Sequence, residues 1–191
     1  MTNVPFAGPE DFRDIESVNH FAVASADGAD PEQVLAALRL RSRDNARTPM
    51  HWDSTAAAGF TTGQPWIAVN PNYRDINAAA QADDPDSVLA HFRAVIELRH
   101  SDPVVAHGDF TMLLPEDEQV YAFTRSYQGN ELLVVGNFSG SAARAAVSDE
   151  ADWAGAELVL GNYPPADGRS DVPDDQIRLR PWEARIYRRG R

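Results

Sequence analysis

The spacing of the apolar residues changes near residue 101, and this change limits what the chain can fold into. From Asp84 to His100 the apolar residues recur at helical spacing, and Asp84-Pro85 is a typical helix start. After residue 104 they form short segments separated by turns rich in Gly, Pro, Asn and Ser. The pattern predicts a mixed α and β chain that ends in an antiparallel β-sandwich.

The same change predicts two parts, residues 1–101 and residues 102–191. Six segments of the second part have the strand pattern: 110–114, 120–124, 132–135, 158–160, 177–179 and 184–187. In the first part, Asp30-Pro31 predicts the start of a helix over 32–40, and a further helix is expected over 9–21. Between Arg41 and Ala80 we expect one long loop, a feature that is usually functional when it occurs inside a compact domain.

Composition excludes several functional classes. The 191 residues include 29 acidic and 17 basic residues, all of the latter arginine, for a net charge of −12. This balance argues against nucleic acid or an anionic membrane as partner, and no apolar run is long enough to span a bilayer. With no cysteine and no closely spaced histidines, we expect no metal and no cofactor. The N-terminal residues lack the features of a secretory signal, so we expect a cytoplasmic protein.

The densest polar cluster of the sequence lies at residues 41–53. Arg43 and Arg47 each carry a planar fork of donors that suits the vicinal hydroxyls of a sugar. Aromatic side chains that can stack on sugar rings follow in the same loop: Trp52, Trp66 and Tyr73. The alternative interpretation is that Arg43–Asp44 and Arg47–Asp53 form ion pairs that only hold the loop together. We assign no carboxylate as catalytic, since most acidic groups lie at helix starts or turns.

An ordered series of motifs carries a resemblance to a known family. The series is RDNARTPMHW at 43–52, GFTTG at 59–63, PW at 65–66 and VNPNY at 69–73. With these motifs the chain resembles the C-terminal part of the oligo-1,6-glucosidase/α-glucosidase group of glycoside hydrolase family 13. His51 departs from the pattern, because the family usually has Gln there. The resemblance implies the last helix and the loop after the eighth strand of a (β/α)8 barrel, followed by the sandwich.

The resemblance also implies what this chain lacks. The family uses a retaining mechanism with an Asp nucleophile and a Glu acid, and a third Asp in an Asn-His-Asp segment. None of these motifs occurs in the sequence. By the same resemblance, Arg43 binds hydroxyls of the terminal glucose, and Arg47 lies beside it at the mouth of the site.

We therefore expect a fragment of an α-glucosidase that acts on terminal α-1,6 or α-1,4 bonds and is inactive alone. It would bind gluco-oligosaccharides only together with the missing barrel. Three alternatives stay open: a carbohydrate-binding module, a truncated structural fragment, and part of a glucosyltransferase or isomerase. Without the barrel, the apolar helix face is expected to cause self-association through Val88, Leu89, Phe92, Val95 and Ile96.

Overall fold

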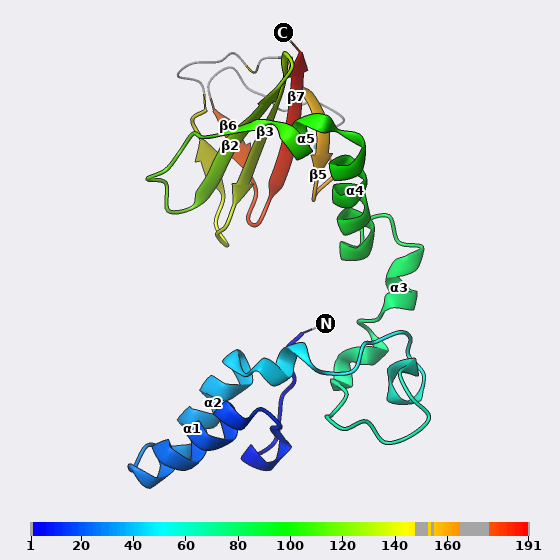
Figure 1. Ribbon diagram of the computed structural model, residues 1–191, viewed down its shortest axis with the longest axis vertical. Helices are drawn as coiled ribbons and strands as arrows, with labels where there is room; N and C mark the ends of the chain where they lie inside the picture. The colour runs from blue at the N-terminus through cyan, green and yellow to red at the C-terminus, as the bar shows by residue number, and fades with distance from the viewer. Residues whose placement is uncertain (1, 148–152, 154, 165–175, 191) are drawn as a thin grey trace. The chain divides into compact units, whose positions relative to one another are not determined.

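The computed structural model describes residues 2–147, 153, 155–164 and 176–190. The chain divides into two compact units, residues 1–85 and residues 86–191. Figure 1 shows that the first is helical and irregular, whereas the second is built around a β-sheet. No helix in the described part of the chain is long and apolar enough to cross a membrane. The prediction of a mixed α and β chain with an antiparallel C-terminal sheet is confirmed.

Two helices, α1 (Ile15–Ala26) and α2 (Pro31–Arg41), pack side by side in the first unit (Figure 1). The α2 prediction is confirmed, and Asp30 caps this helix by accepting a hydrogen bond from the Glu32 amide at 3.0 Å. An apolar core joins α2 to the N-terminal segment and to the long loop. Its buried members are Val4, Phe6, Phe12, Val34, Leu35, Leu38 and Ile67.

The helix predicted over 9–21 is wrong at both ends. Residues Pro9–Asp11 form a 3₁₀ turn, η1, and α1 begins only after Asp14, whose side chain caps it by accepting from the Ser17 amide at 3.3 Å. Two acidic residues are the physical reason. Asp11 accepts hydrogen bonds from the amides of Ala7 and Gly8 and thereby closes the first turn, while Asp14 starts a separate helix.

The long loop predicted between residues 41 and 80 is confirmed. It contains three 3₁₀ turns, η2 (Arg43–Ala46), η3 (Ala56–Gly59) and η4 (Pro71–Arg74), and then the short helix α3 (Ala78–Ala82). Ala57, Ala58 and Gly59 all have left-handed backbone angles. The positive φ of 65° at Gly59 favours glycine, and a Cβ there would also lie 2.7 Å from Asp53 Oδ2, so the Asp53 side chain would have to move.

The second unit begins with α4 (Val88–Ser101) and α5 (Pro103–His107). The predicted helix start at Asp84-Pro85 is wrong, because Ser87 is the capping residue and accepts from the Ala90 amide at 3.1 Å. The sequence analysis missed α5. Asp102 caps α5 through the Val104 amide and also pairs with Arg188 at 2.5 Å, which ties the helix junction to the last strand.

All six predicted strands are present, although their ends differ, and the described residues also form a short strand, β4, that the sequence pattern did not predict. In chain order they are β1 (Asp109–Met112), β2 (Val120–Tyr127), β3 (Asn130–Asn137), β4 (Ala143–Ala145), β5 (Glu157–Gly161), β6 (Ile177–Leu179) and β7 (Ala184–Gly190). Five strands form one antiparallel sheet in the order β1-β2-β3-β7-β5, and β4 pairs with β6 in a second sheet. The two sheets enclose one core, as a sandwich requires.

That core consists of inward-facing residues from both sheets together with Trp153 and Ala156, which precede β5. Its buried members are Val120, Ala122, Leu133, Val135, Ala143, Ala145, Trp153, Ala156, Ile177, Leu179 and Tyr187. Buried polar groups close the end of the sandwich near β7. The Asn137 amide group donates to the carbonyls of Ser141 and Arg180, and Glu183 accepts hydrogen bonds from both Arg180 and Arg185.

Candidate functional site

The turn η2 carries the two arginines that the sequence analysis selected. It follows α2 directly, because Ser42 leaves the helical conformation and its hydroxyl accepts a hydrogen bond from the Asp44 amide at 3.2 Å. This capping turns the chain sharply and places Arg43 at the start of the turn and Arg47 just after its end. The two side chains therefore belong to one rigid local frame.

Asp44 is the centre of that frame, although the sequence suggested it only as an ion-pair partner of Arg43. Its side chain is fully buried, and its Oδ2 accepts hydrogen bonds from the backbone amides of Arg13 at 2.7 Å and Asp14 at 2.9 Å. The other carboxylate oxygen faces Arg47, whose guanidinium lies 3.6 Å from Asp44 and 3.7 Å from Asp14. Two buried carboxylates thus hold Arg47 against the start of α1.

Two asparagines fix the N-terminal segment against the same frame. Asn45 accepts from the Val4 amide at 3.0 Å and donates to the Arg39 carbonyl at 2.9 Å. Asn70, which is buried, donates to the backbone carbonyls of Thr2 and Asn3, both at 3.0 Å. The RDNAR and VNPNY motifs therefore act partly as a clasp that holds the N-terminal segment. No local pattern predicts this role, because the partners lie far away along the chain.

Arg43 lies on the surface and pairs with Glu16 of α1 at 2.5 Å. The arginine side chain is 58% exposed and the glutamate side chain 71% exposed. The hydrogen bond with Glu16 and the negative charge of Glu16 raise the pKa of the Arg43 guanidinium above its ordinary value. Because both partners are in water, the pair is weak and a ligand with suitable oxygens can displace Glu16.

The ion pairs of the alternative interpretation are wrong in detail. Arg43 pairs with Glu16 rather than Asp44, and Arg47 with Asp14 and Asp44 rather than Asp53. Asp53 accepts instead from the hydroxyl and amide of Thr55, and these hydrogen bonds lower the pKa of its carboxyl group. The two arginines thus differ, since Arg47 is held by buried groups and Arg43 by an exposed one.

The aromatic residues of the loop also differ in exposure. Trp52 and Trp66 are 54% and 58% exposed, so their rings are accessible for stacking. Tyr73 is partly buried and makes an edge contact with His51, with ring centroids 6.1 Å apart. Of the predicted stacking residues, the two tryptophans are therefore the better placed.

His51, where the sequence departs from the family pattern, is buried. Its Nδ1 lies 2.9 Å from the Ile76 carbonyl, whereas Nε2 has no hydrogen-bond partner among the described residues. An amide side chain at this position would present both a donor and an acceptor. The histidine fits the loop but leaves one polar atom unsatisfied.

The exposed groups of this turn are suited to binding a ligand. No group of three His, Asp or Glu side chains in the described ranges is arranged to hold a metal ion. The carboxylates nearest the turn, Asp14 and Asp44, accept hydrogen bonds from backbone amides and face Arg47, although Asp44 Oδ1 has no hydrogen-bond partner among the described residues. The site therefore presents the exposed guanidinium group of Arg43, and the buried hydrogen bonds of Asp44 fix the backbone of the turn that carries it.

Comparisons with known proteins place this turn in a larger context. The model of the α-amylase catalytic domain matches residues 1–108, and that of the maltogenic amylase C-terminal domain matches residues 110–186. The oligo-1,6-glucosidase of Parageobacillus thermoglucosidasius is 40% identical over 98% of this chain, and the trehalose-6-phosphate hydrolase of Escherichia coli K12 is 37% identical over 96%. These matches cover 33% and 32% of the two relatives.

Solved structures give the same result. A trehalulose synthase superposes with a TM-score of 0.89 and 40% identity over 99% of this chain and 34% of its own. The trehalose-6-phosphate hydrolase of Bacillus licheniformis superposes with a TM-score of 0.90 and 32% identity over 100% of this chain and 34% of its own. The chain spans about a third of the length of the relatives it matches.

Proposed function

Because the chain belongs to the α-amylase family, we propose that it forms the C-terminal third of an α-glucosidase of the oligo-1,6-glucosidase type. In this proposal the complete enzyme hydrolyses terminal α-1,6 or α-1,4 glucosidic bonds with retention of configuration. Residues 1–101 belong to the C-terminal part of the catalytic barrel, and residues 102–191 form the C-terminal domain. A cytoplasmic location is part of the same proposal.

The observation that carries the proposal is the surface position of Arg43 on a buried frame. Asp44 and Asn45 fix the backbone of the turn, and Glu16, itself exposed, is the ion-pair partner of the Arg43 guanidinium. The backbone of Arg43 is fixed, and its guanidinium group is held by a weak surface ion pair. Such a guanidinium can donate two hydrogen bonds to neighbouring hydroxyl oxygens of a sugar. Arg43 is therefore the proposed ligand of the terminal glucose, and Arg47, whose side chain is 39% exposed and pairs with Asp14 and Asp44, is its proposed companion at the mouth of the site.

The chain contributes binding groups and no catalytic carboxylate. A retaining glycosidase needs two carboxyl groups about 5–5.5 Å apart on either side of the scissile bond. We assign no residue of this chain to that pair, so the nucleophile and the acid belong to the part of the enzyme that the chain does not span. The isolated chain is therefore expected to release no glucose from isomaltose or 4-nitrophenyl α-glucoside, and measurable release would contradict the proposal.

A chimera gives the positive test. The matched third of the Parageobacillus oligo-1,6-glucosidase is replaced by these 191 residues, and glucose release from isomaltose is measured. We expect an active enzyme, because the binding turn and the C-terminal domain are supplied in the right order. A chimera that is folded, as shown by a cooperative melt, yet inactive would refute the assignment.

An isomerase is the second candidate, because the trehalulose synthase match has the same 40% identity as the oligo-1,6-glucosidase match. The two activities differ in products, since a hydrolase releases glucose whereas an isomerase rearranges sucrose. The chimera cannot separate them, because two-thirds of it comes from a hydrolase. Sucrose products formed by the complete parent protein, resolved by chromatography, decide between the two.

Self-association of the isolated chain is a further part of the proposal. On α4, Val88 is 80% exposed and Phe92 60%, and Val95 and Ile96 are more than one-third exposed. Such a continuous apolar face favours contact between copies. Sedimentation should show a concentration-dependent dimer or larger species that Phe92→Glu disrupts, and a monomer at all concentrations would contradict this part.

A further inference from the structure

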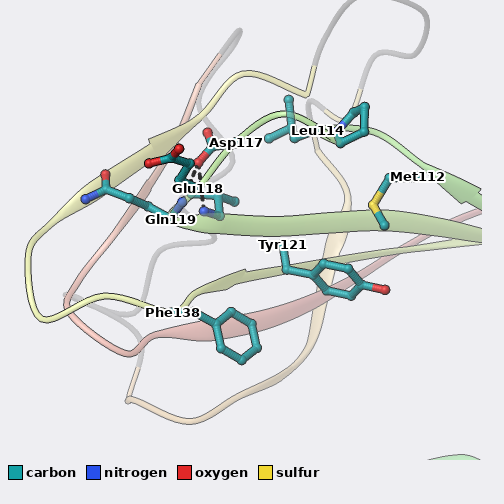
Figure 2. A pocket seen from close by; sticks show the side chains of 9 residues that line it. Met112, Leu114, Asp117, Glu118, Gln119, Tyr121 and Phe138 are labelled. Atoms are coloured by element: carbon teal, nitrogen blue, oxygen red, sulfur yellow. Dashed lines mark hydrogen bonds between the residues drawn. The ribbon is translucent and has the colours of Figure 1, made fainter.

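An open pocket of about 480 Å³ lies on the second unit, where the β1–β2 connection meets the end of β3. Figure 2 shows its lining, with the Tyr121 and Phe138 rings close together and Asp117, Glu118 and Gln119 gathered at the turn. The volume lies within the usual range for small-ligand sites. We propose that this pocket is a second, non-catalytic binding site for a short neutral gluco-oligosaccharide.

The two rings form a rigid aromatic corner. Their centroids are 6.4 Å apart with planes at 90°, and Tyr121 is 44% and Phe138 69% exposed. A sugar ring has an apolar face of C–H bonds, which packs on the electron-rich face of an aromatic ring. A perpendicular pair allows one ring to stack on the sugar and the other to touch its edge.

The strand register holds the corner in place. Tyr121 lies opposite Gly136 on the neighbouring strand, and a Cβ at Gly136 would come within 3.3 Å of the Phe138 ring. The missing side chain at 136 therefore makes room for Phe138 beside Tyr121. The Phe138 backbone amide donates to the Gln119 carbonyl at 2.8 Å. This hydrogen bond holds the backbone of Phe138 next to the start of β2.

The rim of the pocket supplies acidic and neutral hydrogen-bonding side chains, namely Asp117, Glu118 and Gln119. Asp117 accepts from the amides of Gln119 and Val120 at 2.9 Å and 2.8 Å, and it thereby orders the turn that carries Glu118 and Gln119. The exposed Glu118 carboxylate can accept hydrogen bonds from hydroxyl groups, and the Gln119 side-chain amide can both donate and accept hydrogen bonds. The pocket lining contains no basic residue, so phosphorylated and other anionic sugars are disfavoured.

The choice of a glucosyl ligand rests on the proposed function, whereas the aromatic corner and the acidic rim stand independently of it. An open site of this size should bind weakly, with a dissociation constant of about 1 mM. The ligand most compatible with one perpendicular ring pair is a disaccharide or trisaccharide. Isomaltose is therefore the probe.

The test is titration of the 191-residue chain with isomaltose, followed by calorimetry and by NMR of backbone and aromatic groups. We expect saturable shifts at Tyr121 and Phe138, and roughly tenfold weaker binding for Tyr121→Leu and for Phe138→Ala. Phe110→Ala is the matched control, because Phe110 is an exposed aromatic residue of the same sheet, 49% exposed, outside the pocket. It should bind isomaltose like the unaltered chain.

Several outcomes would overturn the proposal. Absence of shifts at the pocket, equal binding of the open-chain polyol sorbitol, or equal losses in all three variants would each do so. If the variants instead change only the association state in sedimentation, the corner is a protein interface. Each variant's amide spectrum must match that of the unaltered chain, and Tyr121→Phe, which keeps the ring, should retain most of the affinity.

The same experiment separates this site from the proposed function. Shifts confined to the Arg43 turn would refute the pocket and leave the glucosidase assignment intact. Isomaltose binding at Tyr121 and Phe138 together with an inactive chimera would support the pocket and refute that assignment. The two results are therefore independent.

Discussion

The two units of this chain are stabilised in different ways. In residues 86–191, neighbouring strands bring apolar residues into one core between two sheets, and ladder hydrogen bonds satisfy the backbone. In residues 1–85, a smaller apolar core is supplemented by single polar side chains that join distant segments, such as Asn70 with Thr2 and Asp44 with Arg13. A loop can therefore be held rigidly without regular structure, provided that its buried backbone groups find side-chain partners.

This difference has a functional consequence. The sandwich is organised to be stable, whereas the clasped loop leaves its exposed groups, Arg43, Trp52 and Trp66, at the surface of a fixed frame. Long loops carried on a scaffold commonly provide ligand contacts for this reason.

The largest expected effect is a cavity in the sandwich. Leu133 is fully buried between the sheets, so Leu133→Ala should lower the free energy of unfolding by about 3 kcal/mol. Urea unfolding and hydrogen exchange at the β2 and β3 amides measure this loss. Val134→Ala is the control, because Val134 lies on the opposite face of the same strand and is only partly buried. If both variants lost the same free energy of unfolding, the core between the sheets would not be the main source of stability of this unit.

Glu183 gives the next effect, a test of the polar part of the sandwich. Burial raises the pKa of its carboxyl group, but hydrogen bonds from Arg180 and Arg185 outweigh burial and hold the pKa below the ordinary 4.5. A lowered pKa contributes stability that is present above pH 4.5 and is lost as the pH falls through the folded-state value.

Glu183→Gln should therefore cost about 2 kcal/mol near neutral pH, and the difference from the unaltered chain should shrink below pH 4.5. Urea unfolding across that range measures both quantities. Glu157→Gln, at an exposed position of β5, serves as control and should change little. A cost that stays constant with pH would show that the charge of Glu183 is unimportant.

A smaller effect is expected in the clasp. Asn70→Ala removes the amide that donates to Thr2 and Asn3 and should cost about 1–2 kcal/mol, with faster hydrogen exchange at residues 2–6. Asn70→Asp keeps the shape but points a carboxylate at the same carbonyl oxygens, so it should cost more than alanine. The opposite order would contradict the assigned role.

The smallest effect on stability is expected at Arg43. The pair with Glu16 is exposed, so Arg43→Ala should leave the urea midpoint unchanged within error. A clear shift of the midpoint would show that Arg43 is part of the frame rather than a group that the frame presents. In that case Arg43, like Arg47, would be a residue that stabilises the fold of the turn.

The contrast between the units also explains what the sequence could predict. Strands such as 177–179 and the helix over 32–40 have local signals, namely an apolar pattern and an Asp-Pro start, and both were predicted correctly. The family resemblance, carried by the motifs at 43–73, is confirmed by the catalytic-domain match. Local signals were weaker at 9–21 and at 84–87. Asp14 and Ser87 cap the two helices there, so both helices begin later in the chain than the sequence pattern predicts.

The polar partners of the site could not be predicted. Asp44 and Arg13 are 31 residues apart, and Asn70 and Thr2 are 68 apart, so no periodicity links them. The interpretation that Arg43 binds Asp44 relied on adjacency in the sequence, but the start of η2 directs the Asp44 side chain towards the amides before α1. Spacing selects candidate residues, and tertiary structure decides their partners.

The most direct test of the account is the effect of Arg43 on catalysis by the chimera with the Parageobacillus enzyme. We expect Arg43→Ala to lower kcat/KM for isomaltose at least about tenfold, without changing the melting temperature. Arg41→Ala, which removes an exposed arginine at the end of α2, should leave kcat/KM unchanged. Unchanged kcat/KM for the Arg43 variant would contradict the central claim that the clasped turn presents Arg43 to the sugar.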